Sequence, residues 1–317
     1  MTMKVLNMLI GTVVLALSFT AQAQGERIDQ KLDIPANARV VIDTMRGNVD
    51  IRGNSNNVAH VTGRLDKHAE KFVFELNGDT LTIKVEMPKR GNYNDNDGNE
   101  LTITLPETAR VEARGVSVDF KVTSFKAAVT ANTVSGDVKA SKLTGNIQLE
   151  SVSGDIDAKE LAGELVLRSV SGDVTDHGSD SSRASYSSVS GDVAAKTNAS
   201  VVRVEAVSGD IELALQRIDS LHVNSVSGDV DASLEMAREG RINVESVSGE
   251  VNMMFKGSID ADIDAKTSAG GAIHNHLTQQ QAEESAFGIG QRLSLQLGER
   301  SGSMNFRTVS GDIVLKK

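Results

Sequence analysis

The chain has 317 residues, a formal net charge of −10 at pH 7 and no cysteine, which excludes disulfides, thiolate metal ligands and a cysteine nucleophile. The basic residues are scattered along the sequence, and this argues against nucleic acid or anionic lipid as a partner. Aromatic residues make up only 3% of the chain. Sugar-binding grooves and protein hot spots rely on aromatic side chains, so the composition favours neither.

The N-terminus has the layout of a secretory signal peptide. Lys4 precedes an apolar run from Met8 to Phe19, and the small-residue pattern Ala21-Gln22-Ala23 follows it. The run is too short to span a membrane, and no later apolar stretch is long enough to do so. We therefore expect residues 1–23 to be removed and the mature chain to be exported to the periplasm or the cell surface, without a membrane span.

A short motif, Val-Ser-Gly-Asp or a close variant, recurs along the chain. Two degenerate units are expected beside it, one with Val118 at the glycine position and one at Ile289 to Leu295 with Gln291 there. Neighbouring units lie 18 to 21 residues apart, with one gap of 41 before the last. This self-similarity is typical of a solenoid. The motif glycines are Gly136, Gly154, Gly172, Gly191, Gly209, Gly228, Gly249, the degenerate Gly270 and Gly311.

Apolar residues alternate within each unit, as in Val152-x-Gly154-x-Ile156-x-Ala158, and this pattern predicts half-buried strands whose apolar side chains and motif glycine point inward. The step between runs is three residues instead of two, so the chain must turn a corner there. We predict an all-β fold: a parallel β-solenoid of about eleven coils, with two strands in each coil. A glycine at an inward position indicates that two backbones approach closely.

The domain organisation follows from where the repeat begins. Residues 24–106 are expected to form an N-terminal β cap that includes a hairpin around Asn77-Gly78-Asp79, and residues 107–317 are expected to form the solenoid. An insertion near 275–288 begins with a capping-box pattern, which predicts a short helix at Gln279 to Ala286. The final unit ends two residues before the C-terminus, so we expect this helix to cover its open edge and the protein to be a monomer.

The motif aspartates are the candidate binding residues. If coils stack about 4.8 Å apart, the carboxylates form a row whose neighbours repel one another, so the row needs hydrogen bonds or cations in compensation. One interpretation is that these side chains accept hydrogen bonds from nearby backbone N–H groups. The other is a calcium ladder, with calcium as the one candidate cofactor. The row contains Asp137, Asp155, Asp173, Asp192, Asp210 and Asp229, and it continues at Glu250 and Asp312.

No catalytic residues are predicted. The sequence has no G-x-S-x-G elbow, P-loop or G-x-G-x-x-G motif. Pairs of carboxylates at the spacing found in glycosidases are not evidence for an active site here, because any carboxylate repeated in stacked coils produces such pairs. His274 and His276 would share one face of a strand and could ligate a metal, but no third ligand is identifiable, so they are also consistent with a surface loop.

The repeated VSGD units, the exported N-terminus and the lead-in GNVDIRG followed by LTITLP resemble the bacterial adhesin-like family known as domain of unknown function 4097. The resemblance covers nearly all of the mature chain. It implies a β-strand repeat domain without an established reaction or assigned catalytic residues. We therefore expect a non-catalytic cell-envelope protein that binds or scaffolds an envelope protein or a surface polysaccharide. A β-helical carbohydrate-active enzyme and a calcium-binding repeat protein are the alternatives.

Overall fold

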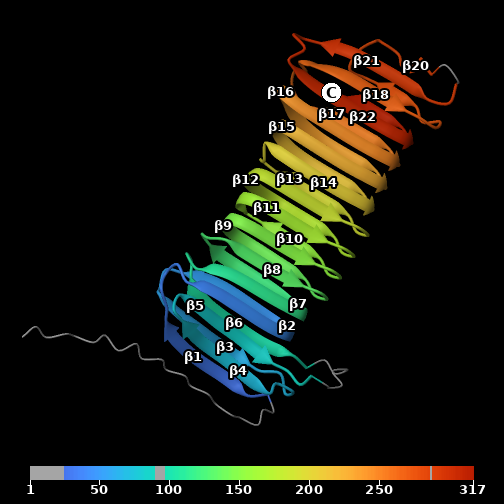
Figure 1. Ribbon diagram of the computed structural model, residues 1–317. Coiled ribbons are helices and arrows are strands. Elements are labelled where there is room, and N and C mark those ends of the chain that lie inside the picture. Colours follow the sequence, from blue (N-terminus) through green and yellow to red (C-terminus); the bar gives the residue numbers. More distant parts are fainter. Residues whose placement is uncertain (1–24, 90–96, 286–287) are drawn as a thin grey trace, which may run out of the picture.

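The computed structural model describes residues 25–89, 97–285 and 288–317, so the predicted signal peptide lies outside the described part. These residues form a long column of stacked strands, with the N-terminal strands at one end (Figure 1). The described residues contain strands and no helix, which confirms the all-β prediction. Accordingly, the described ranges offer no helical segment that could cross a lipid bilayer.

The strands, in chain order, are β1 (Arg27–Asp33), β2 (Arg39–Asn54), β3 (Val58–Arg64), β4 (Lys71–Asn77), β5 (Thr80–Glu86), β6 (Asn99–Pro106), β7 (Arg110–Phe125), β8 (Val129–Thr133), β9 (Val138–Ser151), β10 (Ile156–Lys159), β11 (Ala162–Ser169), β12 (Val174–Ser188), β13 (Val193–Thr197), β14 (Val201–Ser208), β15 (Ile211–Ser227), β16 (Val230–Ser248), β17 (Val251–Phe255), β18 (Ala261–Thr267), β19 (Ile273–Asn275), β20 (Glu283–Glu284), β21 (Gln291–Leu297), β22 (Gly302–Ser310) and β23 (Ile313–Lys316).

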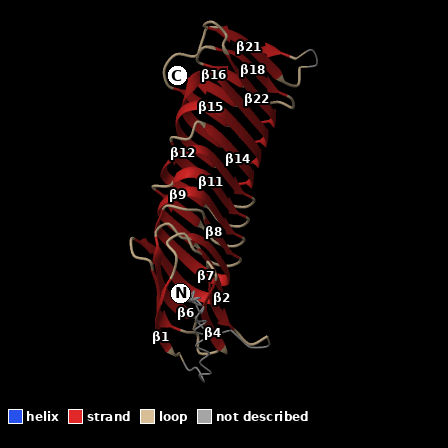
Figure 2. Cartoon of the chain, turned by 60° about the vertical axis from the view of Figure 1, so that its left-hand side comes forward, coloured by secondary structure: helices blue, strands red, loops and turns tan. Residues whose placement is uncertain are grey.

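Successive units of the repeat stack in parallel, as the sequence period predicts. Ile156 of β10 pairs with Val138 of β9 on one side and Val174 of β12 on the other. Strands such as β10, which follow a VSGD motif, form one side of the column, called sheet 1 below. Strands such as β11, which precede the next motif, form the other side, called sheet 2. Several long strands bend from one sheet into the other (Figure 2), and this arrangement is that of a β-solenoid.

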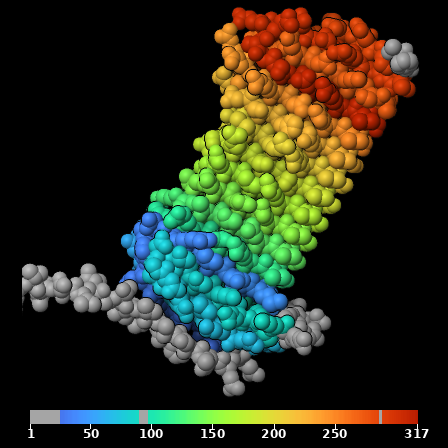
Figure 3. All heavy atoms as spheres, viewed as in Figure 1, coloured from blue at the N-terminus to red at the C-terminus, as the bar shows by residue number. Residues whose placement is uncertain are grey.

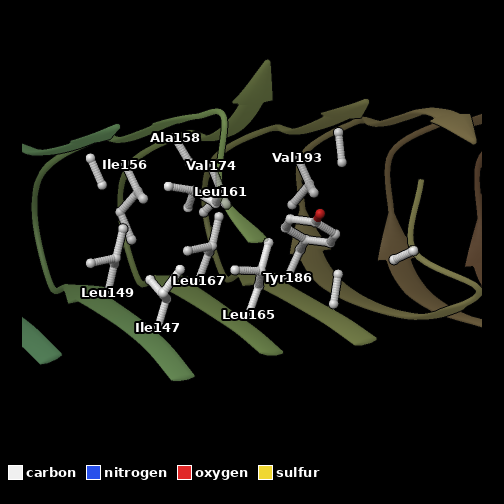
Figure 4. Packing of buried hydrophobic residues seen from close by; sticks show 14 of the residues in the cluster. Ile147, Leu149, Ile156, Ala158, Leu161, Leu165, Leu167, Val174, Tyr186 and Val193 are labelled. Carbon is white, nitrogen blue, oxygen red and sulfur yellow. The ribbon is translucent and has the colours of Figure 1, made fainter. Parts of the chain in front are cut away.

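The core lies between the two sheets and runs the length of the column. Leu149 and Leu165 of sheet 2 point toward Ile156 and Val174 of sheet 1 (Figure 4). All four side chains are almost completely buried. Each fully buried aliphatic side chain stabilises the fold by about 1.5–3 kcal/mol, so the alternation of apolar residues is the main source of stability.

The motif valines do not point inward, which corrects the prediction made for Val152 and its equivalents. Val152 is 44% exposed, whereas Ser151, directly before it, is 4% exposed. The physical reason is the position of the corner: β11 and its equivalents end at or just after this serine, and the chain bends through Val-Ser-Gly before sheet 1 begins. The inward-outward alternation therefore continues through Ser151 and breaks inside the motif, two residues later than the step between Leu149 and Val152 that the sequence pattern indicates.

The close backbone approach predicted at the motif glycines is present at all of them except Gly270, and the approaching backbone belongs to the neighbouring coil and not to the opposite sheet. In the degenerate unit, Gly271, one residue later than predicted, takes this position, since a Cβ built on it would lie 1.8 Å from the carbonyl oxygen of Gly311. A Cβ atom built on Gly154 would lie 2.0 Å from the carbonyl oxygen of Gly136, and one on Gly172 would lie 2.2 Å from that of Gly154. Val118 stands at the equivalent position of the first unit, because its carbonyl oxygen lies 2.2 Å from a Cβ built on Gly136. A side chain at these glycines would separate adjacent coils.

At the N-terminal end, the parallel stack changes to antiparallel strands. β2 is part of the stack, since it pairs in parallel with β5, β6 and β7. Beyond it, β3 pairs antiparallel with β6 and β1 pairs antiparallel with β3, which closes sheet 1. The β4–β5 hairpin, predicted around Asn77-Gly78-Asp79, closes sheet 2. A buried ion pair between Arg46 and Asp66 joins the end strands to the stack.

The C-terminal end differs from the prediction in the order of its strands. β22 pairs with β16 on one side and β18 on the other, so the last unit of the sequence lies inside the stack (Figure 1, red between orange). The unit expected at Ile289 to Leu295 is not a parallel coil, because β21 runs antiparallel to β18. Reversed strands therefore terminate sheet 2 at both ends of the column.

The helix predicted at Gln279 to Ala286 is absent from the described residues 279–285, and Ala286 lies outside them. The segment instead forms bends and the two-residue strand β20, which pairs with β21. Its polar side chains explain why: the Asn275 amide donates to the Thr278 hydroxyl (2.8 Å) and to the Gln280 carbonyl (2.7 Å). These local side-chain bonds engage the carbonyl of Gln280, which a helical turn would need as a backbone acceptor.

We predict that Gly154→Ala destabilises the fold by about 1–3 kcal/mol, because its methyl group must displace the backbone of Gly136. Urea unfolding measures the change. Asp155→Asn is the matched control at the next position: it keeps an oxygen acceptor for the neighbouring coil and should cost less. An unfolding midpoint equal to that of the unchanged chain for Gly154→Ala would contradict the close coil-to-coil contact.

Candidate functional site

The corner at each motif consists of hydrogen bonds between one coil and the next. The hydroxyl of Ser151 donates to the carbonyl of Gly136 (3.0 Å), and that of Ser169 donates to the carbonyl of Gly154 (2.9 Å). In the first unit, Thr133 makes the same bond to Val118 (3.0 Å). Thr133, Ser151, Ser169 and Ser188 therefore each fasten their coil to the previous one. In later coils this bond is replaced or missing, since Ala206 stands at the same position and the hydroxyl of Ser225 has no hydrogen-bond partner.

The motif aspartates form the second half of this connection. The carboxylate of Asp137 accepts a hydrogen bond from the backbone N–H of Asp155 (3.1 Å), and that of Asp155 accepts one from Asp173 (2.9 Å). The pattern continues along the row, with Asp173, Asp192, Asp210 and Asp229 accepting from the next unit. One oxygen of each carboxylate thus satisfies a backbone donor that the corner would otherwise leave unpaired.

The aspartate row was predicted either to bond backbone N–H groups or to bind calcium, and these contacts are those of the first interpretation. Calcium binding stays a prediction. In residues 25–89, 97–285 and 288–317, no group of three or more histidine, aspartate or glutamate side chains is arranged to hold a metal ion. Asp137 is half-buried and the other members of the row, from Asp155 to Asp229, are exposed to solvent.

The outward-turned motif valines form a continuous row along the corner, which the sequence analysis did not predict. Nine of them are between 42% and 47% exposed. The register of sheet 2 places each one beside the valine of the next coil, including Val309 beside Val247. The row, called the valine ladder below, consists of Val116, Val134, Val152, Val170, Val189, Val207, Val226, Val247 and Val309. With about 4.8 Å between strands, it extends for roughly 40 Å.

A groove runs beside the valine ladder over its N-terminal half. It has a volume of about 640 Å³ and lies between the valines from Val134 to Val189 and the outward side chains of sheet 2. Ser151 and Ser169 line its floor, and Glu150 and Arg168 its far side. Because Arg168 and Glu150 lie 3.7 Å apart, the charges on that side partly neutralise each other.

A second hollow extends the groove toward the N-terminal end. It has a volume of about 540 Å³ and is lined by Met45, Met87 and Val116 together with charged side chains. The two hollows share Arg114 and Gly115, so they are continuous at the first coil of the ladder. In the space-filling view, the coils follow one another without interruption along the column (Figure 3). The groove is therefore long, shallow and open, unlike an enclosed small-molecule pocket.

In addition to the Arg46–Asp66 pair at the N-terminal end, the middle of the core contains a buried polar cluster that the sequence analysis also missed. The Tyr186 hydroxyl donates to the carboxylate of Asp176 (2.7 Å), and the Ser179 hydroxyl lies 2.6 Å from the same oxygen. The Ser179 hydroxyl is also 2.7 Å from that of Thr197. Burial raises the pKa of Asp176 above its ordinary value, and burial with the nearby carboxylate raises the pKa of Tyr186. The only sequence signal is that the alternation fits poorly around Arg183 to Tyr186.

The histidine pair lies at the C-terminal end of sheet 1. His274 and His276 are both exposed, and His274 Nε2 lies 3.6 Å from a carboxylate oxygen of Asp312. They border a hollow of about 400 Å³ lined by the Thr278 hydroxyl and the amide side chains of Gln279, Gln280 and Gln281. His274 belongs to β19 and His276 directly follows it, so the pair lies on the surface beside the inserted segment and not within a loop.

The family model for Toastrack DUF4097 matches residues 37–255. The chain belongs to this family. The match includes β2 and the motif units from Gly136 to Gly249. It therefore includes the aspartate row from Asp137 to Asp229 and the valine ladder except Val309. The family resemblance predicted from the sequence is therefore confirmed.

The comparison with solved structures gives matches at low sequence identity and with TM-scores below 0.5. A "putative adhesin" from Bacteroides fragilis is 14% identical over 93% of this chain and 99% of its own, with a TM-score of 0.40. One from Parabacteroides merdae is 12% identical over 75% and 97%, with a TM-score of 0.43. A "putative cell adhesion protein" from Clostridium sporogenes is 13% identical over 92% and 100%, with a TM-score of 0.22. No curated protein matches the sequence.

The calcium ladder is tested by thermal unfolding. A ligand that binds only the folded state raises its stability, so calcium bound along Asp137 to Asp229 should raise the melting temperature in millimolar calcium relative to chelator. Magnesium at the same concentration is the control for ionic strength. Coinciding melting curves in calcium and chelator would exclude the ladder.

The buried carboxylate predicts a pH dependence. Because the folded-state pKa of Asp176 lies above the ordinary 3.8, the folded chain keeps a proton that the unfolded chain has lost. Stability from this group is therefore complete below pH 3.8, falls as pH rises toward the folded-state pKa, and is level above it. Asp176→Asn should remove this fall while keeping an acceptor for Tyr186.

Urea unfolding of the unchanged chain and of Asp176→Asn at several pH values measures the difference between the two curves. Asp180→Asn, an exposed carboxylate in the same strand, controls for the loss of one negative charge. If the two variants show the same pH dependence relative to the unchanged chain, burial of Asp176 does not affect its titration.

Proposed function

We propose that the protein is a non-catalytic binding protein of the cell envelope, which holds an extended segment of another envelope protein along the groove beside the valine ladder. The observation that carries this proposal is the row of nine exposed valines at one corner of the column. Export rests on the predicted signal peptide. The family and the repeat architecture support a binding or scaffolding role, because solenoids offer long continuous surfaces.

The exposed valines leave a large apolar surface in contact with water when the protein is unbound, and this is energetically unfavourable. Nine valines that are each nearly half exposed present on the order of 600 Å² of apolar surface, which is the upper end of the range for the largest patch on a typical monomer. Covering this surface at roughly 25 cal/mol per Å² would contribute on the order of 10 kcal/mol before the costs of association. A partner that lies along the ladder would bury much of it.

The chemistry of the groove favours a polypeptide over a polysaccharide. Its lining combines valine side chains with serine and threonine hydroxyls and with Asn132, Glu150 and Arg168, and includes no aromatic ring. Sugar rings usually stack on aromatic side chains. An extended polypeptide can place apolar side chains against the ladder and polar side chains against sheet 2.

The proposal of a non-catalytic role rests on the regularity of the site. The aspartate contact repeats from Asp137 to Asp229, and the serine contact repeats at Ser151, Ser169 and Ser188, whereas a catalytic centre needs a local group of side chains with different roles. A separate hollow lies on sheet 1 and is lined by residues that include Asp50, Asp119 and Lys121. The carboxylate of Asp50 is paired with Arg52, and this pairing lowers the pKa of Asp50. That hollow therefore holds a compensated surface charge.

We predict that the triple variant Val152→Ser, Val170→Ser, Val189→Ser loses at least tenfold of the partner captured by crosslinking in intact cells. Removing three neighbouring apolar side chains takes away part of the surface that the partner covers. The captured material is identified by mass spectrometry and quantified against the unchanged chain. The melting temperature of the purified variant shows that the fold is intact.

The matched control is Val166→Ser, Met254→Ser, Val314→Ser, which removes three outward apolar side chains away from the ladder. It should capture the partner as well as the unchanged chain does. Equal loss in both triple variants would contradict the groove as the binding site. Captured polysaccharide instead of a defined envelope protein would overturn the proposed class of partner.

A further inference from the structure

Each end of the column presents the outer edges of two sheets, and three of these four edges are protected against pairing with another chain. β1 ends sheet 1 at the N-terminal end, and Arg27, Asp29, Lys31 and Asp33 alternate along it as exposed charges. β19 ends sheet 1 at the other end and has only three residues. Charged side chains and short length are the usual means of blocking an edge.

The third edge, β21 of sheet 2, is covered by the segment before it. β20 pairs with Gln291 and Arg292. The side-chain amide of Gln280 then donates to the carbonyl of Ser294 (3.1 Å). Leu277 and Ala282 of the same segment pack against the core. This segment therefore covers the C-terminal edge, the role that the sequence analysis assigned to a helix.

The fourth edge, β4, has none of these protections. Its sequence is KFVFELN, and of the described strands it pairs only with β5. Phe72 and Phe74 lie on one face with ring centroids 6.3 Å apart and the planes nearly parallel, at 17°. This strand is seven residues long and contains two phenylalanines, one valine and only two charged side chains. Such an edge favours pairing with another strand.

The backbone of β4 has a defined pattern of free groups. Asn77 faces Thr80 across the two-residue turn Gly78-Asp79, and the closing pair of such a hairpin exchanges hydrogen bonds. Alternate pairs do the same along the ladder, so Val73 and Glu75 direct their backbone groups toward β5. Phe72 and Phe74 therefore direct their N–H and C=O groups toward the open edge.

A second copy of β4 fits this edge in one antiparallel register with complementary charges. When Val73 faces Val73 of the second copy, Lys71 faces Glu75 and Phe72 faces Phe74, each twice because of the twofold symmetry. Opposite charges and aromatic pairs across neighbouring strands are both stabilising. The same register joins the free backbone groups of Phe72 and Phe74, so backbone and side chains agree.

We propose that the protein forms a dimer through β4, in which the N-terminal ends of two columns meet and sheet 2 continues from one chain into the other. The partner is a second copy of this chain, held by an isologous antiparallel strand pair centred on Val73. This replaces the expectation of a monomer, which rested on the C-terminal edge alone. The dimer leaves the valine ladder of each chain free, so it is independent of the binding function proposed above.

The absence of cysteine from the chain makes a single-cysteine variant a clean probe. Val73 would occupy a non-hydrogen-bonded pair with itself, where Cα atoms lie about 4.5 Å apart, within the range for a disulfide. We expect Val73→Cys in the full chain to give a disulfide-linked dimer on mild oxidation. Glu75→Cys, two residues away on the same face, should stay monomeric, because its own copy lies roughly 13 Å away along the strands.

A second variant tests the dimer without oxidation. Val73→Lys places like charges opposite each other and should shift the chain to monomer in sedimentation analysis, with an unchanged melting temperature because the side chain lies on the outer face. Equal crosslinking of Val73→Cys and Glu75→Cys would overturn the register. A monomeric unchanged chain at high concentration, together with no crosslinking of Val73→Cys, would overturn the dimer.

Discussion

The transfer of hydrogen bonds from one coil to the next at the Val-Ser-Gly corner is the constraint on which the rest of the structure depends. A strand inside a sheet has both neighbours for its backbone groups, but a corner must find other partners for them. This chain uses the serine before the valine and the aspartate after the glycine. Glycine is required between them because any side chain there would meet the neighbouring backbone. The motif is therefore a solution to stacking.

This requirement also explains the exposed valines. Once Ser151 must reach inward to the carbonyl of Gly136, the next residue points outward, whatever its polarity. A polar residue there would satisfy the corner equally well, so stacking does not account for valine in nine coils. The corner fixes the direction of the side chain, and the binding role proposed for the ladder accounts for its chemistry.

Much of the architecture could be predicted because each coil repeats the same local problem. The period, the inward aliphatic residues and the close approach at Gly154 follow from alternation and spacing in the sequence. The direction of Val152 could not be predicted in the same way, since the pattern of alternate apolar residues continues through the motif although the backbone bends there. The missing helix at residues 279–285 shows the same limit: Asn275 donates to the carbonyl of Gln280, and Gln280 donates to the carbonyl of Ser294 in β21, and a local capping pattern cannot reveal either bond.

The position of β22 and β23 inside the stack has a consequence for the order in which the column assembles. Most coils can dock onto a finished neighbour as soon as they emerge, so the column can grow from its N-terminal end. β18, in contrast, contacts the growing stack only through β22, which belongs to residues 302–317 at the end of the chain. The C-terminal end of the column therefore stays open until β22 and β23 have docked, and their docking is the step that completes this end of the fold.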